Sequence, residues 1–231
     1  MALDPRSVEA QTDLALAIVN RVLDRMTDSD AADLARAKGL VDQALVASPR
    51  SARAHFVKGQ LLRVQGRIEE ALFEYETVIA SDRNSVPGLV NVARCRMLTG
   101  SLDEAIPLME QAIRRSPRDS QIGVWHAAIG MVHLLQSRID EAIVWLAKAR
   151  SVSPDKPYNH LHLAAAYALR GDLDRAAPEL AEARRLDGGT LYSSVAHLKA
   201  FPGAWWGVRK IRALFETTYF AGLRKAGMPE E

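Results

Sequence analysis

Pairs of adjacent carboxylates recur along the sequence, and neighbouring carboxyl groups can perform general acid–base catalysis. The pairs are Glu69–Glu70, Asp103–Glu104 and Asp140–Glu141. Each lies inside a near-copy of one motif: GRIEEAL (66–72), GSLDEAI (100–106) and SRIDEAI (137–143), with GDLDRAA (171–177) as a fourth copy. A catalytic pair has no reason to recur at regular intervals, whereas a structural unit does. Because the helix dipole favours carboxylates in the first turn, we interpret these acids as helix-stabilising residues.

Histidine and cysteine are the other residues that could perform chemistry. His126 and His133 are seven residues apart and share a helix face, but no acidic or cysteine partner lies at metal-ligand spacing. The sequence has no phosphate-binding loop, zinc-protease motif or nucleophile elbow. The single cysteine, Cys95, excludes internal disulfide bonds and fits a reducing cytoplasm. We therefore predict a cytoplasmic protein with no catalytic residue, metal site or cofactor.

The motif alanines define a repeat. Ala71, Ala105, Ala142 and Ala176 are 34, 37 and 34 residues apart. The same register contains small residues in a preceding helix, at Gly59, Ala93, Gly130 and Ala164, which we expect to face these alanines and let two helices approach closely. Gly66, Gly100 and Gly171 fit a left-handed turn between the two helices, and Ser137 replaces glycine in one copy.

A period of about 34 residues with this pattern resembles the tetratricopeptide repeat family. The resemblance covers roughly residues 8–188 and implies an all-α fold, a right-handed superhelix of about five helix-turn-helix repeats. The repeats fall at about 8–51, 52–85, 86–122, 123–156 and 157–188. The register is lost beyond residue 188, so 189–231 are expected to form a C-terminal helical cap.

In this family the first helices line a concave groove that binds a protein or peptide. Transferred to this sequence, the resemblance implies these groove residues: Arg53, Phe56, Gln60, Arg63, Asn91, Arg94, Met97, Met131, Tyr158 and Leu161. Only Asn91 matches the polar clamp of chaperone-binding members, so a chaperone-tail receptor is disfavoured. Three arginines, Arg53, Arg63 and Arg94, predict weak binding of acidic or polar segments. The apolar half of the groove is either a peptide site or a surface covered by the protein's own tail.

The tail, WWGVRKIRALFETTYFAGLRKAGMPEE (205–231), resembles the end of tetratricopeptide regions that follow class III nucleotide-cyclase or winged-helix regulator domains in bacterial multidomain proteins. Two functions stay open: a protein-interaction scaffold that is a fragment of a larger protein, or a regulatory module acting on its own upstream effector domain. We expect residues 191–226 to form a degenerate sixth hairpin on the fifth repeat. It would bury Phe215 and at least one of Trp205 and Trp206, because exposed apolar patches are avoided.

The composition of the chain bears on whether it binds nucleic acid or a membrane. The chain is 48% apolar and 25% charged, with a net charge of only +2 and basic residues interspersed with acids. No basic stripe indicates direct contact with nucleic acid. The longest uncharged run, 121–137, contains two histidines and is too short for a membrane span. We therefore expect neither a nucleic-acid partner nor a membrane.

Overall fold

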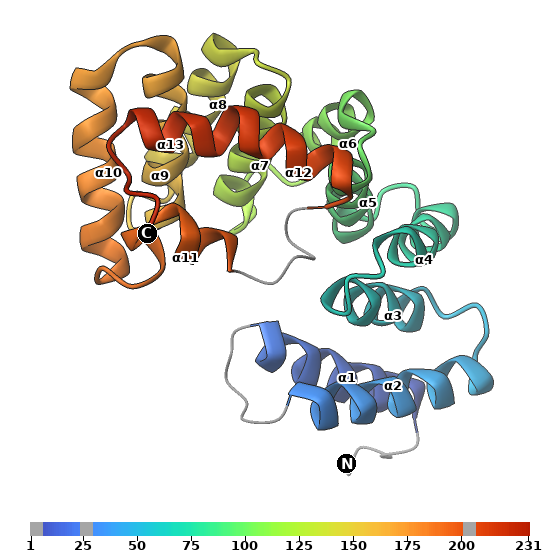
Figure 1. The fold of residues 1–231 in the computed structure, drawn as a ribbon. Coiled ribbons are helices and arrows are strands. Elements are labelled where there is room, and N and C mark those ends of the chain that lie inside the picture. Colours follow the sequence, from blue (N-terminus) through green and yellow to red (C-terminus); the bar gives the residue numbers. More distant parts are fainter. Residues whose placement is uncertain (1–6, 24–29, 201–206) are drawn as a thin grey trace. The chain divides into compact units, whose positions relative to one another are not determined.

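The computed structural model describes residues 7–23, 30–200 and 207–231, and all regular elements in these ranges are helices (Figure 1). This confirms the predicted all-helical fold of paired helices. The chain divides into two compact units, Met1–Cys95 and Arg96–Glu231. The predicted separate cap at 189–231 thus groups with the helices that precede it.

The first unit contains two helix pairs and most of a fifth helix. The pairs are α1 (Val8–Leu23) with α2 (Asp30–Ala47), and α3 (Ala52–Val64) with α4 (Ile68–Ser81); α5 (Val86–Thr99) ends in the second unit. Ser51 caps α3 by accepting a hydrogen bond from the amide of Ala54. The core between α1, α2 and α3 consists of Ala15, Ile18, Val19, Ala37, Val41, Val57 and Leu61.

The second unit continues the same architecture. Its helices are α6 (Leu102–Arg115), α7 (Ile122–Leu135), α8 (Ile139–Val152), α9 (Pro157–Arg170) and α10 (Leu173–Asp187). Helices α7 and α8 pack as one pair, α9 and α10 as the next, and α8 contacts α9. Each predicted repeat range therefore holds two helices, although α7 begins one residue early.

Two small residues of the first helices lie directly against the second helix of their pair. A Cβ atom at Gly59 would lie 2.6 Å from a ring carbon of Tyr75, and one at Gly130 would lie 2.6 Å from Leu146 Cγ and 3.1 Å from the Leu146 backbone nitrogen. Both neighbours are large side chains four residues after the motif alanine. These glycines therefore allow a close approach of the two helices and make room for a bulky, fully buried residue of the partner helix.

The turn inside each helix pair has the same left-handed backbone in all four motif copies. Its φ values are 75° at Gly66, 101° at Gly100, 91° at Gly171 and 59° at Ser137. Serine carries a Cβ atom that makes this conformation unfavourable by about 1 kcal/mol relative to glycine. The fourth turn therefore keeps the geometry of the others under strain.

Replacing Ser137 with glycine is expected to raise the free energy of unfolding by about 1 kcal/mol, because it removes this strain. The Ser137 side chain is exposed and has no described hydrogen bond that would be lost. Ser101→Gly is the control, since Ser101 has a φ of −84° and gains nothing from glycine. Urea denaturation of both variants checks the prediction, and equal midpoints would contradict it.

The tail contacts the fifth repeat, as predicted, and it also reaches α7 and the end of α5. Its first part, a 3-10 turn η1 (Leu191–Ser193) and α11 (Val195–Lys199), contacts α10, where Arg184 donates to the carbonyls of Tyr192 and Ser193. The rest is one continuous helix made of α12 (Arg209–Phe215), a π-helical turn η3 (Glu216–Phe220) and α13 (Ala221–Lys225).

This C-terminal helix lies against the first helices of the fourth and fifth repeats (red in Figure 1). Its α13 part packs on α9 and η3 contacts both α9 and α7. At its start the Val208 amide donates to the Leu98 carbonyl at the end of α5, over 2.9 Å. Phe215 is buried as predicted. Trp205 and Trp206 lie outside the described residues, as do residues 1–6 and 24–29.

Candidate functional site: an apolar pocket beside the C-terminal helix

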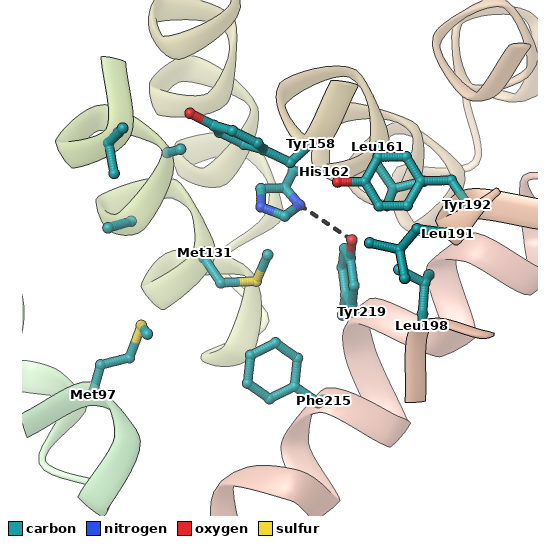
Figure 2. Close-up of a pocket in the computed structure, with 13 residues that line it drawn as sticks. Met97, Met131, Tyr158, Leu161, His162, Leu191, Tyr192, Leu198, Phe215 and Tyr219 are labelled. Atoms are coloured by element: carbon teal, nitrogen blue, oxygen red, sulfur yellow. Dashed lines mark hydrogen bonds between the residues drawn. The ribbon is translucent and has the colours of Figure 1, made fainter. Parts of the chain in front are cut away.

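A pocket of about 350 Å³ lies in the second unit, between the first helices of the repeats and the C-terminal helix (Figure 2). Its residues come from the end of α5, from α7, α9, the segment 191–198 and the C-terminal helix. They are Met97, Val124, Ala127, Ala128, Met131, Tyr158, Leu161, His162, Leu191, Tyr192, Leu198, Phe215 and Tyr219.

Helical spacing explains why these residues meet. On α7, positions 124, 127, 128 and 131 follow the i, i+3, i+4, i+7 pattern of one helix face, and on α9 positions 158, 161 and 162 do the same. Phe215 and Tyr219 are four apart on the C-terminal helix, with rings 6.0 Å apart in an edge-on arrangement. The pocket is therefore bounded by apolar faces of three helices.

The C-terminal helix comes very close to α9 because of Gly222. A Cβ atom there would lie 2.5 Å from the carbonyl oxygen of Ala165, which is closer than real Cβ atoms approach. One turn earlier, the π-helical turn contains Thr218, whose hydroxyl donates to the Leu214 carbonyl over 2.6 Å. Such π-turns are frequent at functional sites, and this one holds Tyr219 at the pocket.

His162 and Tyr219 form the polar pair of the pocket. His162 Nδ1 and the Tyr219 hydroxyl are 3.2 Å apart, and their rings meet edge to face (Figure 2). Burial lowers the pKa of His162 to about 4 and raises the pKa of Tyr219 well above its usual value. Both side chains are thus uncharged at neutral pH, so the Tyr219 hydroxyl can donate to a neutral imidazole.

The chemistry of the pocket is that of a binding site for an uncharged group. None of the lining residues within the described part of the chain is Asp, Glu, Lys or Arg. His162 Nε2 has no hydrogen-bond partner among the described residues and stays available to a ligand. An apolar pocket with one or two placed polar groups is the usual form of a ligand site.

The His162 imidazole gives a pH-dependent prediction. The folded chain keeps this ring neutral down to about pH 4, whereas the unfolded chain gains its proton below about pH 6.5. The unfolded state then binds more protons, so the free energy of unfolding falls as pH drops from 6.5 towards 4. After allowance for solvent access we expect this histidine to contribute about 2 kcal/mol of that fall.

Urea denaturation between pH 7 and pH 4.5, compared with a His162→Gln variant, measures this contribution. Glutamine can keep a hydrogen bond to Tyr219 but does not titrate. The variant should lose less stability than the wild type on acidification. Parallel pH profiles for the two proteins would show that His162 is not buried in the neutral form.

Four predicted groove residues meet in this pocket: Met97, Met131, Tyr158 and Leu161. The sequence reasoning did not select His162 or the tail residues. His162 is four residues after Tyr158, so the helical spacing contained a signal for it. The contribution of Phe215 and Tyr219 depended on where the tail docks, which the spacing does not give.

The other six predicted groove residues lie in the first unit, where Arg53 lines a hollow of about 510 Å³ with residues of α1 and Ser51. Arg53 is exposed and pairs with Asp13 over 2.5 Å. Arg63 is buried rather than on the surface, and it donates to Gln60 Oε1 over 2.8 and 3.2 Å. Arg63 therefore departs from the predicted groove surface, whereas Arg53 is exposed.

The remaining three predicted groove residues are Asn91, Phe56 and Arg94. Asn91 is buried and donates to the Pro87 carbonyl over 2.8 Å. The Phe56 ring lies 6.0 Å from that of Tyr75. Arg94 is half-buried on α5. None of these arrangements marks a site for a charged peptide.

Two features of the described residues bear on other functions. No group of three or more His, Cys, Asp or Glu side chains is placed to hold a metal ion there. In the same part of the chain, no helix combines the length and apolar character needed to cross a bilayer. Cys95 is buried and free of disulfide bonds.

Known proteins match the chain in sequence and in fold. Residues 28–87 match the family model described as tetratricopeptide repeat. Tetratricopeptide repeat protein 21B of Homo sapiens is 25% identical over 101 residues, a match that covers 42% of this chain and 8% of the human protein. The chain thus spans a small part of that curated relative.

Three solved structures share the fold. The structure of pilF from Pseudomonas aeruginosa has a TM-score of 0.66 at 17% identity, covering 95% of this chain and 93% of that chain. A thermophilic TPR protein of Thermus thermophilus has a TM-score of 0.63 at 22% identity, covering 82% and 98%. MamA from Desulfovibrio magneticus has a TM-score of 0.61 at 16% identity, covering 78% and 96%. These likenesses establish a tetratricopeptide-repeat fold.

Proposed function

We propose that this tetratricopeptide-repeat chain is a non-catalytic protein-interaction module that anchors an uncharged apolar side chain of its partner in the pocket beside the C-terminal helix. The observation that carries the proposal is the pocket itself: buried and half-buried side chains, most of them apolar, surround a space of about 350 Å³ on the face formed by the first helices of the repeats. This is the face on which the family resemblance places a peptide groove.

The size and charge of the pocket define the anchor. Ligand pockets commonly measure about 300–1,000 Å³ and are mainly apolar, and this one is at the small end. A charged side chain would lose its hydration without gaining a partner, because no lining residue carries a full charge and His162 stays neutral. An aromatic or branched aliphatic residue fits, and His162 Nε2 could donate to a backbone carbonyl beside it.

The proposed context is a larger bacterial cytoplasmic protein. The single buried cysteine suits a reducing compartment, and the human relative is a much longer chain than the segment that matches. The alternative is a regulatory module that acts on its own upstream effector domain, a nucleotide cyclase or a DNA-binding transcription regulator. That alternative rests on the sequence resemblance of the tail. Direct contact with nucleic acid is not part of either proposal.

One matched pair of substitutions tests the pocket. Val124 lines the pocket and is half-buried, whereas Val144 is 55% exposed on α8 and lies outside it. Val124→Glu and Val144→Glu make the same chemical change, but only the first introduces a charge into the pocket. The probe is a phage-displayed library of short random peptides selected on the wild-type chain.

Selected peptides should share an uncharged aromatic or branched aliphatic residue. Val124→Glu should weaken their binding at least tenfold, about 1.4 kcal/mol or more, while Val144→Glu leaves it unchanged. Circular dichroism confirms that both variants are folded. Peptides that bind the two variants equally, or a selection that enriches charged anchors, would contradict the proposal.

A further inference from the structure

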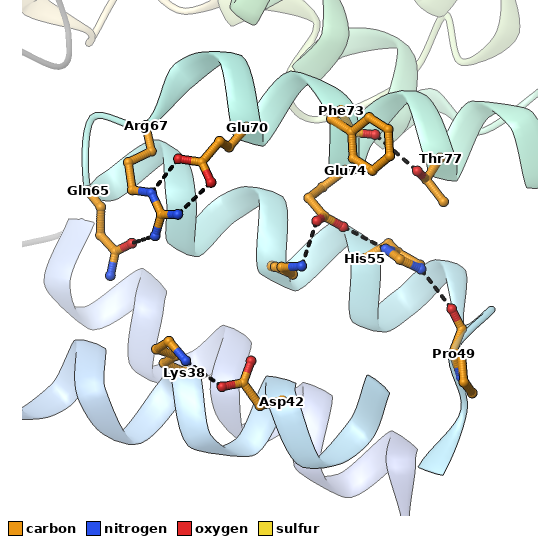
Figure 3. A network of polar contacts seen from close by, with 11 residues as sticks. Lys38, Asp42, Pro49, His55, Gln65, Arg67, Glu70, Phe73, Glu74 and Thr77 are labelled. Carbon is orange, nitrogen blue, oxygen red and sulfur yellow. Dashed lines mark hydrogen bonds and ion pairs between the residues drawn. The ribbon is translucent and has the colours of Figure 1, made fainter. Parts of the chain in front are cut away.

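Two histidines, in different repeats, have the same two neighbours: a glutamate carboxylate and the backbone carbonyl of a proline. On α3, His55 Nδ1 lies 2.6 Å from Glu74 Oε2 and its Nε2 lies 3.0 Å from the Pro49 carbonyl oxygen (Figure 3). On α9, His160 Nδ1 lies 2.7 Å from Glu179 Oε2 and its Nε2 lies 2.8 Å from the Pro154 carbonyl oxygen. In both cases the proline is 6 residues before the histidine and the glutamate 19 after it.

A second cationic side chain contacts each glutamate. Lys58 Nζ lies 2.7 Å from Glu74 Oε1, and Arg150 Nη1 is paired with Glu179 Oε1. A carboxylate and a backbone carbonyl only accept hydrogen bonds. Each histidine therefore has an acceptor at both ring nitrogens, but a neutral imidazole carries a single N–H. A neutral ring would leave one of these two contacts without a proton.

We propose that His55 and His160 are imidazolium ions in the folded protein at neutral pH and act as proton-dependent latches between successive repeats. Each latch joins three segments: the chain just after one second helix, the next first helix, and the second helix that follows. Loss of the proton breaks the contact to the proline carbonyl or to the glutamate. The junction between two repeats then loosens.

The charged groups around each latch are few. Among the described residues, those around His55 are Glu74 and Lys58; Arg53 on the same helix pairs with Asp13 on α1, and Lys38 pairs with Asp42 on α2. For His160 they are Glu179 and Arg150, with Glu182 on α10 paired to Arg185. The histidine side chains are only 16% and 10% exposed. Salt therefore screens these ion pairs much less than surface pairs.

Repeat four contains a natural comparison. His126 stands four residues before Gly130, as His55 stands four before Gly59, so the two occupy the same repeat position. Nineteen residues after His126 comes Trp145 instead of a glutamate, and the two rings are 5.5 Å apart. Burial, with Lys148 nearby, lowers the pKa of His126. The same position without a carboxylate thus holds a neutral ring.

The protonation state can be read directly from imidazole 15N chemical shifts at pH 7.5, where a free histidine is only about one-tenth protonated. His55 and His160 should each show two protonated nitrogens. His126 should show one protonated and one bare nitrogen. Single His→Gln variants assign the signals. A bare nitrogen in His55 and in His160 at this pH would overturn the proposal.

Thermal melting between pH 6.5 and pH 9 tests the latch function. The folded chain keeps protons that the unfolded chain releases above pH 6.5, so stability falls as pH rises. We expect the wild-type melting temperature to drop by about 5 °C over this range. The double variant His55→Gln, His160→Gln should lose most of that dependence, whereas His126→Gln keeps it.

A double variant whose melting temperature falls with pH as steeply as the wild type would rule out the latch. If the double variant does not fold, Glu74→Gln with Glu179→Gln provides the same test, because removal of the carboxylates leaves the rings without the charge that keeps them protonated. The 15N chemical shifts are read on the wild-type chain. They therefore decide the protonation state whether or not the double variants fold.

Discussion

Gly222→Ala is expected to lower the free energy of unfolding by about 3 kcal/mol. The added methyl carbon would lie 2.5 Å from the carbonyl oxygen of Ala165 and 3.0 Å from its carbonyl carbon. These are backbone atoms of α9, so no side chain can rotate away to relieve the clash. The C-terminal helix must move off α9, which exposes Tyr219 and Leu223, now buried.

Gly39→Ala is the matched control for this substitution. Gly39 is exposed within α2, and a Cβ atom there would have nothing within 4 Å. The control should gain about 1 kcal/mol, because alanine favours the helix over glycine by that amount. Guanidinium denaturation of both variants makes the comparison. If Gly222→Ala were as stable as the wild type, the C-terminal helix would not be docked on α9.

Ala142→Leu is expected to destabilise the protein by about 3 kcal/mol, and Ala147→Leu by less than about 1 kcal/mol. Both alanines lie on α8. Ala142 is completely buried in the contact between α7 and α8, where a leucine cannot fit without moving a helix. Ala147 is half-buried and has solvent on one side, so a larger side chain can point outwards.

The measurement is the melting temperature of each variant, with circular dichroism as the check on helix content. For a domain of this size, about 1 kcal/mol corresponds to roughly 2–4 °C. The Ala142→Leu protein should therefore melt many degrees below Ala147→Leu. Equal melting temperatures would mean that the repeat register assigned to the motif alanines is displaced.

Much of the fold could be predicted because it repeats. A period of about 34 residues fixed the order and approximate limits of the helix pairs, and glycine marked the left-handed turns. Ser137 shows that the turn geometry is imposed by packing on both sides, since it adopts a φ of 59° without the residue that favours it. The helix spacing also brought Met97, Met131, Tyr158 and Leu161 to one face, and they line one pocket.

The docking of the tail could not be predicted in the same way. An apolar face at helical spacing shows that a helix will be buried, but it does not say on which surface. The sequence favoured docking on the last repeat, and Tyr219 and Gly222 do contact His162 and Ala165 on α9. The further contact of Val208 with Leu98 of α5 was not predicted. Arg63 was misplaced for a related reason: its hydrogen bonds to Gln60, on the same helix, help it to lie buried.

The latch histidines were visible in the sequence but not recognised. The spacing from Pro49 to His55 to Glu74 recurs from Pro154 to His160 to Glu179. A comparison of polar positions between repeats would have found it. Metal-ligand spacing, the pattern considered for His126 and His133, does not reveal these contacts. The partners of His55 and His160 are a glutamate on the second helix of the same repeat and a backbone carbonyl just before the first helix.

The pocket beside the C-terminal helix is most directly tested by the methyl resonances of 13C-methionine in the full chain during titration with a selected peptide. Met97 and Met131 line the pocket, whereas Met109 is buried elsewhere and Met228 lies near the chain end. We predict that the Met97 and Met131 signals shift in a saturable way while those of Met109 and Met228 stay in place. Binding that leaves Met97 and Met131 unmoved would contradict this account and place the partner on another surface.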